Sequence, residues 1–210
     1  MNCTLRFGSK LGFLSGVLMA AASLASCAGS ATPSILRGAM EPEADPGKQY
    51  IWVGKGTAWR YQGSDWVRVP SHDYQFLVRQ NRFEDRWESL KIQNRTNEKY
   101  DGSAGPADQQ HFFRIQYGTP AQDGTRPILL SSTYGDGTGR SDAAYRLQEL
   151  EFDARGISSF APYNRFRLRQ EYRYEEGLLL ETIELFKRGR DGKETPFMRF
   201  EERARMVIVH

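Results

Sequence analysis

A serine, two aspartates and a histidine lie close together in one polar stretch, Asp101-Gly102-Ser103-Ala104-Gly105-Pro106-Ala107-Asp108 followed by His111. A hydroxyl, a carboxylate and an imidazole can together carry out hydrolysis, because the imidazole takes the hydroxyl proton as the oxygen attacks. The same composition is also typical of a connection between strands, in which Asp and Ser side chains bond to the nearby backbone. We therefore keep two interpretations of residues 101–111: a hydrolase site and, favoured by the composition, a structural loop.

The other catalytic and metal-binding motifs are weak. Ser71-His72-Asp73 cannot form a triad within itself, because adjacent residues of an extended chain point in opposite directions. His72, His111 and His210 are too few and too scattered for a metal site, and no phosphate-loop, zinc-protease or nucleophile-elbow motif occurs. The glycine-rich run 134–139 lacks the lysine and helix of a phosphate loop and predicts a plain loop. We assign no catalytic residue, metal or cofactor.

Two sets of side chains are candidates for ligand binding. Arginines alternate with apolar residues along one predicted strand, so they share one face; they are Arg165, Arg167, Arg169 and Arg173. Arginine suits an anionic ligand because its planar guanidinium forms paired hydrogen bonds to carboxylate or phosphate. The alternative is ion pairing with glutamates of neighbouring strands, which are Glu149, Glu151, Glu181 and Glu184. Trp52 and Trp59, with Trp66 and Trp87, could line a pocket, although such aromatics are more often core.

The segments that must position these residues have the composition of β-strands. From Tyr50 onward, aromatic and β-branched residues come in short runs separated by turn residues. We predict strands at residues 49–61, 66–69, 74–82, 87–95, 111–117, 127–134, 145–153, 164–174, 178–188 and 197–209. Gly54 and Gly56 interrupt the first strand and predict a bulge or sharp bend.

One hairpin has a defined register. Asp191-Gly192 predicts a type I′ turn, which needs positive φ at both central residues. A turn centred there places Phe186 opposite Phe197, Glu184 opposite Arg199 and Ile183 opposite Phe200, so that aromatic, ionic and apolar pairs match.

About ten antiparallel strands without a long helix predict an all-β fold. We expect an antiparallel barrel or strongly curved sheet of lipocalin-like architecture. The arginine face argues against a barrel that spans a membrane, since each lipid-facing arginine would cost about 2–4 kcal/mol at the bilayer midplane. That face should therefore contact water or an aqueous cavity.

The N-terminus has the pattern of an export signal. Arg6 and Lys10 precede an apolar run from Leu11 to Leu24, with no acidic residue before Cys27. The run is shorter than the roughly 20 residues that cross a bilayer, so we predict a removed signal.

The end of this signal, Leu24-Ala25-Ser26-Cys27, resembles the lipobox of bacterial lipoproteins. The resemblance covers only the N-terminal segment. It implies cleavage before Cys27, a diacylglycerol on the Cys27 thiol and an acylated amine, which together form a stable membrane anchor. Ala28 stands where an aspartate favours the inner membrane in this family, which implies the outer membrane, facing the periplasm. Ordinary secretion, with cleavage after Ala22 or Ala25, is the alternative.

The chain is thus divided into a signal peptide (1–26), a flexible tether (27–48) and a single all-β domain (49–210). Pro33, Pro42 and Pro46, without an apolar period, indicate a tether that spans about 25 Å. Without the signal, 27 of the 29 Lys and Arg residues remain against 26 Asp and Glu residues, and this near-neutral charge predicts no nucleic-acid partner.

The leading functional hypothesis is a lipid-anchored cell-envelope protein whose β-domain binds a ligand or supports envelope assembly without catalysis. Its expected partners are the membrane, through the N-terminal lipid, and a lipid, glycan or protein of the envelope. The alternatives are an envelope hydrolase that uses the Asp101–His111 region and a scaffold without a ligand.

Overall fold

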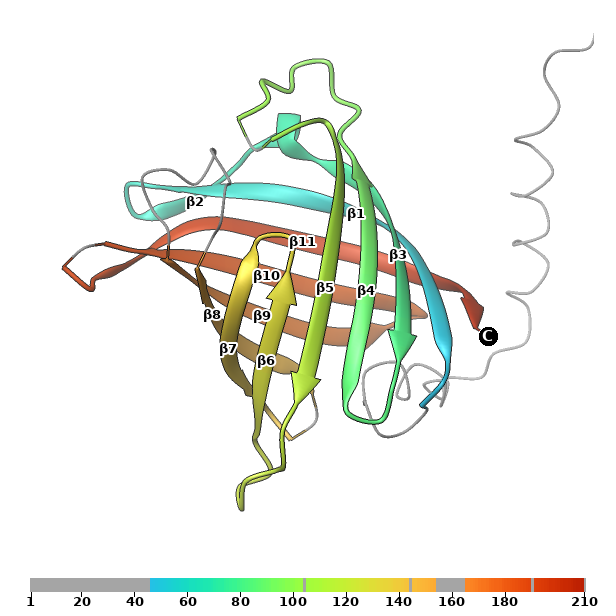
Figure 1. Ribbon diagram of the computed structural model, residues 1–210. Helices are drawn as coiled ribbons and strands as arrows, with labels where there is room; N and C mark the ends of the chain where they lie inside the picture. The colour runs from blue at the N-terminus through green and yellow to red at the C-terminus, as the bar shows by residue number, and fades with distance from the viewer. Residues whose placement is uncertain (1–45, 104, 144, 154–164, 190, 210) are drawn as a thin grey trace, which may run out of the picture. The chain divides into compact units, whose positions relative to one another are not determined.

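Ten antiparallel strands close into a β-barrel, and one short strand is added beside it (Figure 1). The computed structural model describes residues 46–103, 105–143, 145–153, 165–189 and 191–209. The predicted signal, Cys27 and most of the predicted tether lie outside these residues. The strands are β1 (Gln49–Gln62), β2 (Asp65–Arg68), β3 (Tyr74–Arg82), β4 (Arg86–Asn94), β5 (Asp108–Tyr117), β6 (Arg126–Ser132), β7 (Gly135–Ser141), β8 (Leu147–Asp153), β9 (Arg165–Glu175), β10 (Leu178–Arg188) and β11 (Glu194–Val209). The predicted all-β antiparallel barrel is confirmed.

The barrel closes because β1 pairs with the last strand. From β3 to β11 each strand pairs with the next in sequence, and β1 joins β3 to β11. The β1–β11 seam extends from Tyr50 opposite Val209 to Arg60 opposite Met198. The far end of β1 pairs with β2 instead of β3. A short 3-10 helix, η1 (Pro70–His72), follows β2, and β9 to β11 cross β3 to β7 steeply in Figure 1.

The ten barrel strands are not the ten predicted ones. The predicted strand at 66–69 is β2, outside the barrel, whereas β7 was predicted as a loop. That prediction is wrong because glycine here provides space for a neighbouring strand. A Cβ on Gly139 would overlap the carbonyl oxygen of Glu149, and one on Gly137 would overlap that of Glu151. Glycine normally weakens a strand, but it also permits close backbone approach.

Gly54 and Gly56 have the same role in β1, which is a strongly curved strand in Figure 1. The register shift of the β1–β11 pair does not fall at these glycines but between Ile51 and Trp52, where Val207 is the extra residue on β11. Gly54 lies opposite Phe76 and Gly56 opposite Tyr74 in β3, and a Cβ on either glycine would overlap the facing aromatic ring. The two rings therefore lie close over the glycine backbone, as in aromatic rescue of strand glycines.

The register of the β10–β11 hairpin follows the sequence prediction in part. Ile183 lies opposite Phe200 and Glu184 opposite Arg199, as predicted. Phe186 lies opposite Pro196, not Phe197, because an irregularity between Leu185 and Phe186 leaves one extra residue on β11. A bulge of this kind adds a residue to one strand and is not encoded in the turn.

We expect Gly56→Ala to lower the free energy of unfolding by about 1–3 kcal/mol, the usual cost of overpacking. The added methyl group would displace the Tyr74 ring, which is held by a hydrogen bond from its hydroxyl group to Glu202. Urea unfolding measures the change. The control is Gln75→Ala on the outer face of β3, which should change stability by less than about 0.5 kcal/mol. Equal stabilities would contradict the assigned packing.

Candidate functional site

The barrel encloses a cavity of about 800 Å³. Two apolar clusters form most of its wall. The larger one extends over β4 to β11 and includes Ile115, Leu130, Leu150 and Phe152. The smaller one belongs mainly to β1 and β3 and includes Trp52 and Phe76. Phe200 on β11 packs against both clusters, so the cavity is continuous between them.

A cluster of large side chains closes the end of the barrel near the β3–β4 turn. Tyr117 accepts a hydrogen bond at its hydroxyl oxygen from Gln148 Nε2 (2.7 Å) and packs edge-on against Tyr145, with ring centroids 5.0 Å apart. The Arg82 guanidinium lies 5.2 Å from the centroid of the Trp87 ring. All five side chains are buried, which makes this end a floor.

Polar side chains meet inside the barrel and form what we call the carboxylate cluster: Tyr74, Lys91, Gln170, Glu181 and Glu202. Glu202 is 4% exposed; it accepts a hydrogen bond from the Tyr74 hydroxyl group and forms an ion pair with Lys91. Glu181 lies directly opposite Glu202 on β10 and accepts a hydrogen bond from Gln170 on β9. The cluster thus joins five strands across the interior.

The two carboxyl groups are chemically different because, among the described residues, Glu202 forms an ion pair with Lys91 and Glu181 forms none. Burial and, next, the charge of Glu202 raise the pKa of Glu181 to about 7, although Lys91 and Gln170 oppose this shift. Burial and Glu202 also raise the pKa of Tyr74 well above its ordinary value, so this hydroxyl group stays a donor. Near neutral pH Glu181 therefore holds a proton part of the time, while Glu202 is bound to Lys91.

His111 is an uncharged member of the cavity wall. It is buried on β5 opposite Lys91, and the Tyr134 hydroxyl group lies 2.5 Å from Nδ1 and 3.0 Å from Nε2. Burial, together with the charges of Lys91 and Arg95, lowers the pKa of His111 to about 4. The imidazole ring is therefore neutral at physiological pH.

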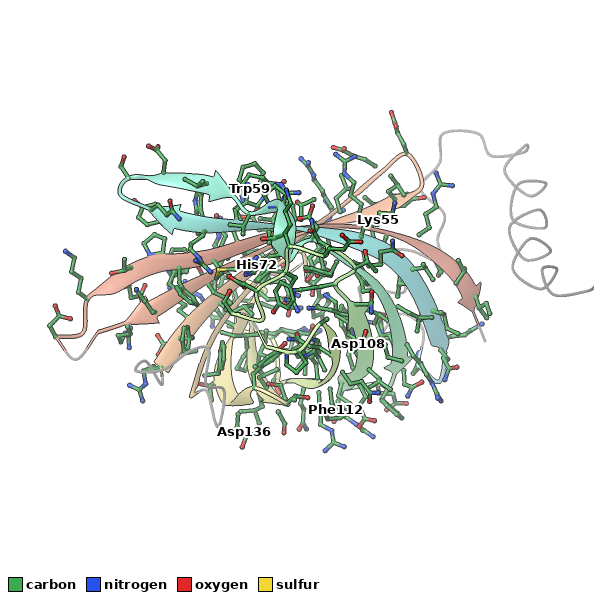
Figure 2. All side chains as sticks on the ribbon, turned by 90° about the horizontal axis from the view of Figure 1, so that it is seen from above. Lys55, Trp59, His72, Asp108, Phe112 and Asp136 are labelled. Atoms are coloured by element: carbon green, nitrogen blue, oxygen red, sulfur yellow. The ribbon has the colours of Figure 1, made fainter. Side chains whose placement is uncertain are left out.

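Cations surround the other end of the cavity, which is covered by the β4–β5 connection and η1. Arg60 on β1 and Arg95 after β4 line the cavity. The Arg95 guanidinium lies over the Tyr100 ring at 5.0 Å, and its two terminal nitrogens lie 3.0 Å from the Gln93 side-chain amide. We call this end the mouth of the barrel; Figure 2 views the barrel from there, with His72 near the centre of the view.

The structure brings Ser103 to a different histidine from the one that sequence pattern suggested. The Ser103 hydroxyl group lies 2.9 Å from His72 Nε2, while His111 contacts Tyr134 inside the barrel. Asp101 accepts a hydrogen bond from the Ser103 backbone and lies 3.8 Å from the same His72 nitrogen. His72 Nδ1 lies 3.1 Å from the Ser71 hydroxyl group. Serine and histidine thus meet at the mouth, but within the described part of the chain His72 Nδ1 contacts Ser71 and not the carboxylate of a triad.

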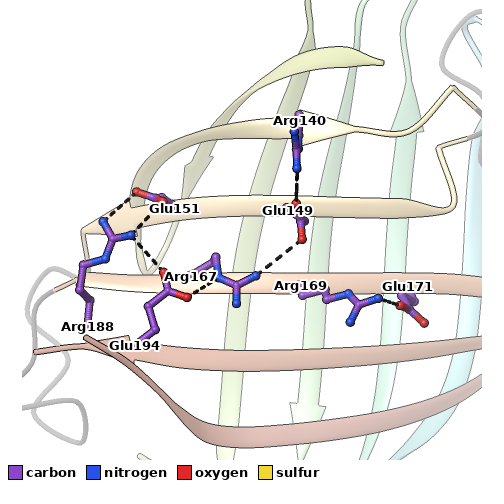
Figure 3. A network of polar contacts seen from close by, with 8 residues as sticks. All are labelled: Arg140, Glu149, Glu151, Arg167, Arg169, Glu171, Arg188 and Glu194. Carbon is purple, nitrogen blue, oxygen red and sulfur yellow. Dashed lines mark hydrogen bonds and ion pairs between the residues drawn. The ribbon is translucent and has the colours of Figure 1, made fainter. Parts of the chain in front are cut away.

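The predicted ligand-binding arginines lie on the outer wall of the barrel, away from the cavity lining. Arg167 forms ion pairs with Glu149 (3.6 Å) and Glu194 (2.9 Å), and Arg169 forms one with Glu171 (Figure 3). Arg173 lies 3.9 Å from Glu175, and Arg165, at the start of β9, is exposed. The ion pairing that the sequence left as an alternative is present in part: of the four glutamates named for it, Glu149 pairs with these arginines among the described residues, and the other partners are Glu171, Glu175 and Glu194.

Trp52 lines the cavity, and so does Trp87. Trp59 does not line it; its ring lies on the outer side of β1 with the Arg68 guanidinium 5.6 Å away. Trp66, on β2, packs against Tyr61 with ring centroids 5.3 Å apart.

Searches for a metal site, for a membrane-spanning helix and for related proteins do not assign a function to the barrel. Among the residues described, no group of three or more His, Cys, Asp or Glu side chains could hold a metal ion. The described part of the chain also contains no helix with the length and apolar character needed to cross a bilayer. Searches against protein-family models and against curated proteins found no match.

The carboxylate cluster was missed at the sequence level, although a signal for it exists. Lys91 alternates in phase with Trp87, and Glu202 with Met198, Phe200 and Ala204. Period-two alternation places such residues on the same face as the core side chains. Charged residues in phase with a core face are therefore candidates for an interior site.

The two shifted pKa values predict opposite pH dependences of stability. The folded barrel keeps a proton on Glu181 that the unfolded chain releases between pH 4.5 and about 7, so stability falls as the pH rises through this window. The folded barrel excludes a proton from His111 that the unfolded chain takes up between pH 6.5 and about 4, so stability falls as the pH falls. Each effect amounts to at most about 3 kcal/mol.

We expect Glu181→Gln to stabilise the barrel relative to the wild type at pH 7 and to lose this advantage toward pH 4.5. His111→Gln should instead gain stability relative to the wild type as the pH falls from 6.5 toward 4. Urea unfolding at a series of pH values measures both differences. Glu184→Gln, on the outer face of the same strand β10, is the control and should show neither trend. If the free energy of unfolding of both variants changed with pH in parallel with that of the wild type, the buried environments assigned to Glu181 and His111 would be wrong.

Proposed function

We propose that this chain is a lipid-anchored protein of the bacterial cell envelope whose barrel binds a small amphipathic molecule. The anchor is the diacylated Cys27, which a lipobox-like sequence precedes. The proposed site of attachment is the outer membrane, with the barrel in the periplasm. Two or more acyl chains exceed the single chain that binds membranes only marginally, so the attachment would be stable.

The observation that carries the binding function is the cavity of about 800 Å³, which falls within the range of natural ligand sites. Its wall combines two apolar clusters with a small polar group, which suits a ligand with a long apolar part and one polar end. The Trp87 indole nitrogen is a buried donor in this wall and has no hydrogen-bond partner among the described residues.

The charges favour an anionic end on the ligand. Arg60, Arg95 and Lys91 line the cavity, whereas Glu202 is already paired with Lys91 and Glu181 holds a proton part of the time near pH 7. The positive end of the cavity is the mouth, where Arg60 and Arg95 lie. A carboxylate or phosphate held there would leave the chain of the ligand among the apolar clusters.

If the proposed anchor is correct, the mature protein has a defined mass. The protein isolated from its own membrane should begin at Cys27 and carry the mass of a diacylglycerol and an amine-linked acyl chain, and Cys27→Ser should remain unprocessed. Intact-mass spectrometry and detergent partitioning measure both. A bare Cys27, or an N-terminus at another residue, would refute the anchor without affecting the barrel.

Ligand binding should change the fluorescence of Trp52 and Trp87. A long-chain fatty acid should bind more tightly than the alcohol or the amine of equal length, because of the cations at the mouth. Ser89→Phe fills the cavity from β4 and should weaken binding at least about tenfold. The matched control is Ser131→Phe on the outer face of β6, which should bind as the wild type does. No response to any of these compounds would count against the binding function.

The envelope hydrolase stays as a second candidate because Ser103 and His72 meet at 2.9 Å at the mouth. In this version His72 takes the place of His111 as the base. Burial lowers the pKa of His72, which keeps the imidazole able to accept a proton. Ester hydrolysis that is lost in Ser103→Ala while ligand binding persists would favour this candidate; binding without hydrolysis would favour the first.

A further inference from the structure

Five large apolar side chains are exposed on neighbouring strands of the outer wall of the barrel. We call them the apolar wall: Val53, Leu77, Leu90, Ile92 and Phe112, each 39–46% exposed. Val53, Leu77 and Ile92 lie opposite one another in a single row across β1, β3 and β4. Leu90 and Phe112 lie opposite each other in the next row, on β4 and β5. Contiguous exposed apolar side chains of this kind mark an interaction surface.

Four exposed cations lie in and beside the rows of the apolar wall, while the exposed Asp108, which accepts a hydrogen bond from Asn94, lies at the β5 end of the neighbouring row. Arg205 lies opposite Val53, Arg79 opposite Leu90, and Lys55 opposite Arg203 in the row above. Among the described residues, none of these four exposed cations forms an ion pair. The nearby Glu88 is bound by Arg86 and Arg114.

The opposite side of the barrel has a different outer surface. In the strand order β9 lies half-way round the barrel from β4, and there the arginines are paired with glutamates (Figure 3). The apolar wall with its unpaired cations is therefore a property of one side. Figure 2 shows Phe112 on the outer side of this wall, away from the interior.

We propose that the apolar wall is a docking face for an anionic lipid surface. The outer wall of a barrel is convex, which suits an extended bilayer surface better than a small molecule. Apolar side chains that enter the interface and cations that meet anionic headgroups act together in peripheral membrane binding. A second copy of this chain fits less well, because a two-fold contact would bring Lys55, Arg203 and Arg205 close to the same cations of the other copy.

This docking face is independent of the acyl anchor and of the cavity, so it can be tested without them. All pairings that close the barrel lie within residues 49–209. The test therefore uses residues 27–210 with Cys27→Ser, which carry neither the apolar signal nor an acylation site. Sedimentation with vesicles of phosphatidylethanolamine and phosphatidylglycerol should capture this protein, and added salt should weaken the binding. Vesicles of phosphatidylcholine alone should capture it poorly.

Two pairs of variants separate the apolar and the electrostatic contributions. Leu77→Glu with Ile92→Glu should lower the partition at least tenfold, whereas Leu129→Glu, at a more exposed apolar site on β6 outside the wall, should not. Lys55→Glu with Arg205→Glu should lower it by at least fivefold for each cation removed, since each contributes about 1 kcal/mol near an anionic surface. Arg140→Glu with Arg173→Glu, on the paired side, is the matched control.

The proposal would be overturned if wild-type protein did not sediment with the anionic vesicles. It would also be overturned if the Leu77→Glu, Ile92→Glu variant bound these vesicles as tightly as the wild type. Formation of a dimer that this variant abolishes, without vesicle binding, would assign the wall to a second copy instead. Capture by an acidic protein without vesicle binding would likewise overturn the lipid assignment. Circular dichroism of each variant checks that the barrel is folded.

Discussion

The carboxylate of Glu202 is the charge that the interior of this barrel must accommodate. It is almost fully buried on β11, and its two bonded partners, Tyr74 and Lys91, come from β3 and β4. A buried ion left without its partner costs about 3–5 kcal/mol, so these strands must present their side chains at one level. Gly56 of β1 lies opposite Tyr74 on one side and opposite Glu202 on the other. Because Gly56 has no side chain, the Tyr74 ring can occupy the space above it and reach Glu202.

This arrangement explains why the barrel is hollow and not packed throughout. A close-packed apolar interior would leave Lys91, Glu181 and Glu202 without room or solvation. The polar group instead lies between two apolar clusters, with the floor of tyrosine, tryptophan and arginine side chains closing one end. The result is a cavity with distinct surfaces: a cationic mouth, a polar centre and apolar flanks. Such an interior has the features of a binding site rather than of a structural core.

Much of the fold could be predicted from the sequence, because alternation and turn residues are local signals. The β10 and β11 pairings of Ile183 and Glu184 followed from the Asp-Gly turn alone. The strand β7 could not be predicted, since its glycines are explained only by the approach of the β8 backbone. The carboxylate cluster depends on which strands lie opposite one another around a closed barrel. Sequence shows that Arg167 faces away from Phe166, but only closure shows which of these faces is inside.

The seam between β1 and β11 joins the first strand of the barrel to the last. Its partners, from Tyr50 with Val209 to Arg60 with Met198, are separated by nearly the whole length of the domain. Contacts of such large sequence separation form late and slowly. A chain that emerges from its N-terminus therefore stays an open sheet, with β1 lacking one neighbour, until β11 is free to pair. Completion of the cavity is in this way tied to the synthesis of β11.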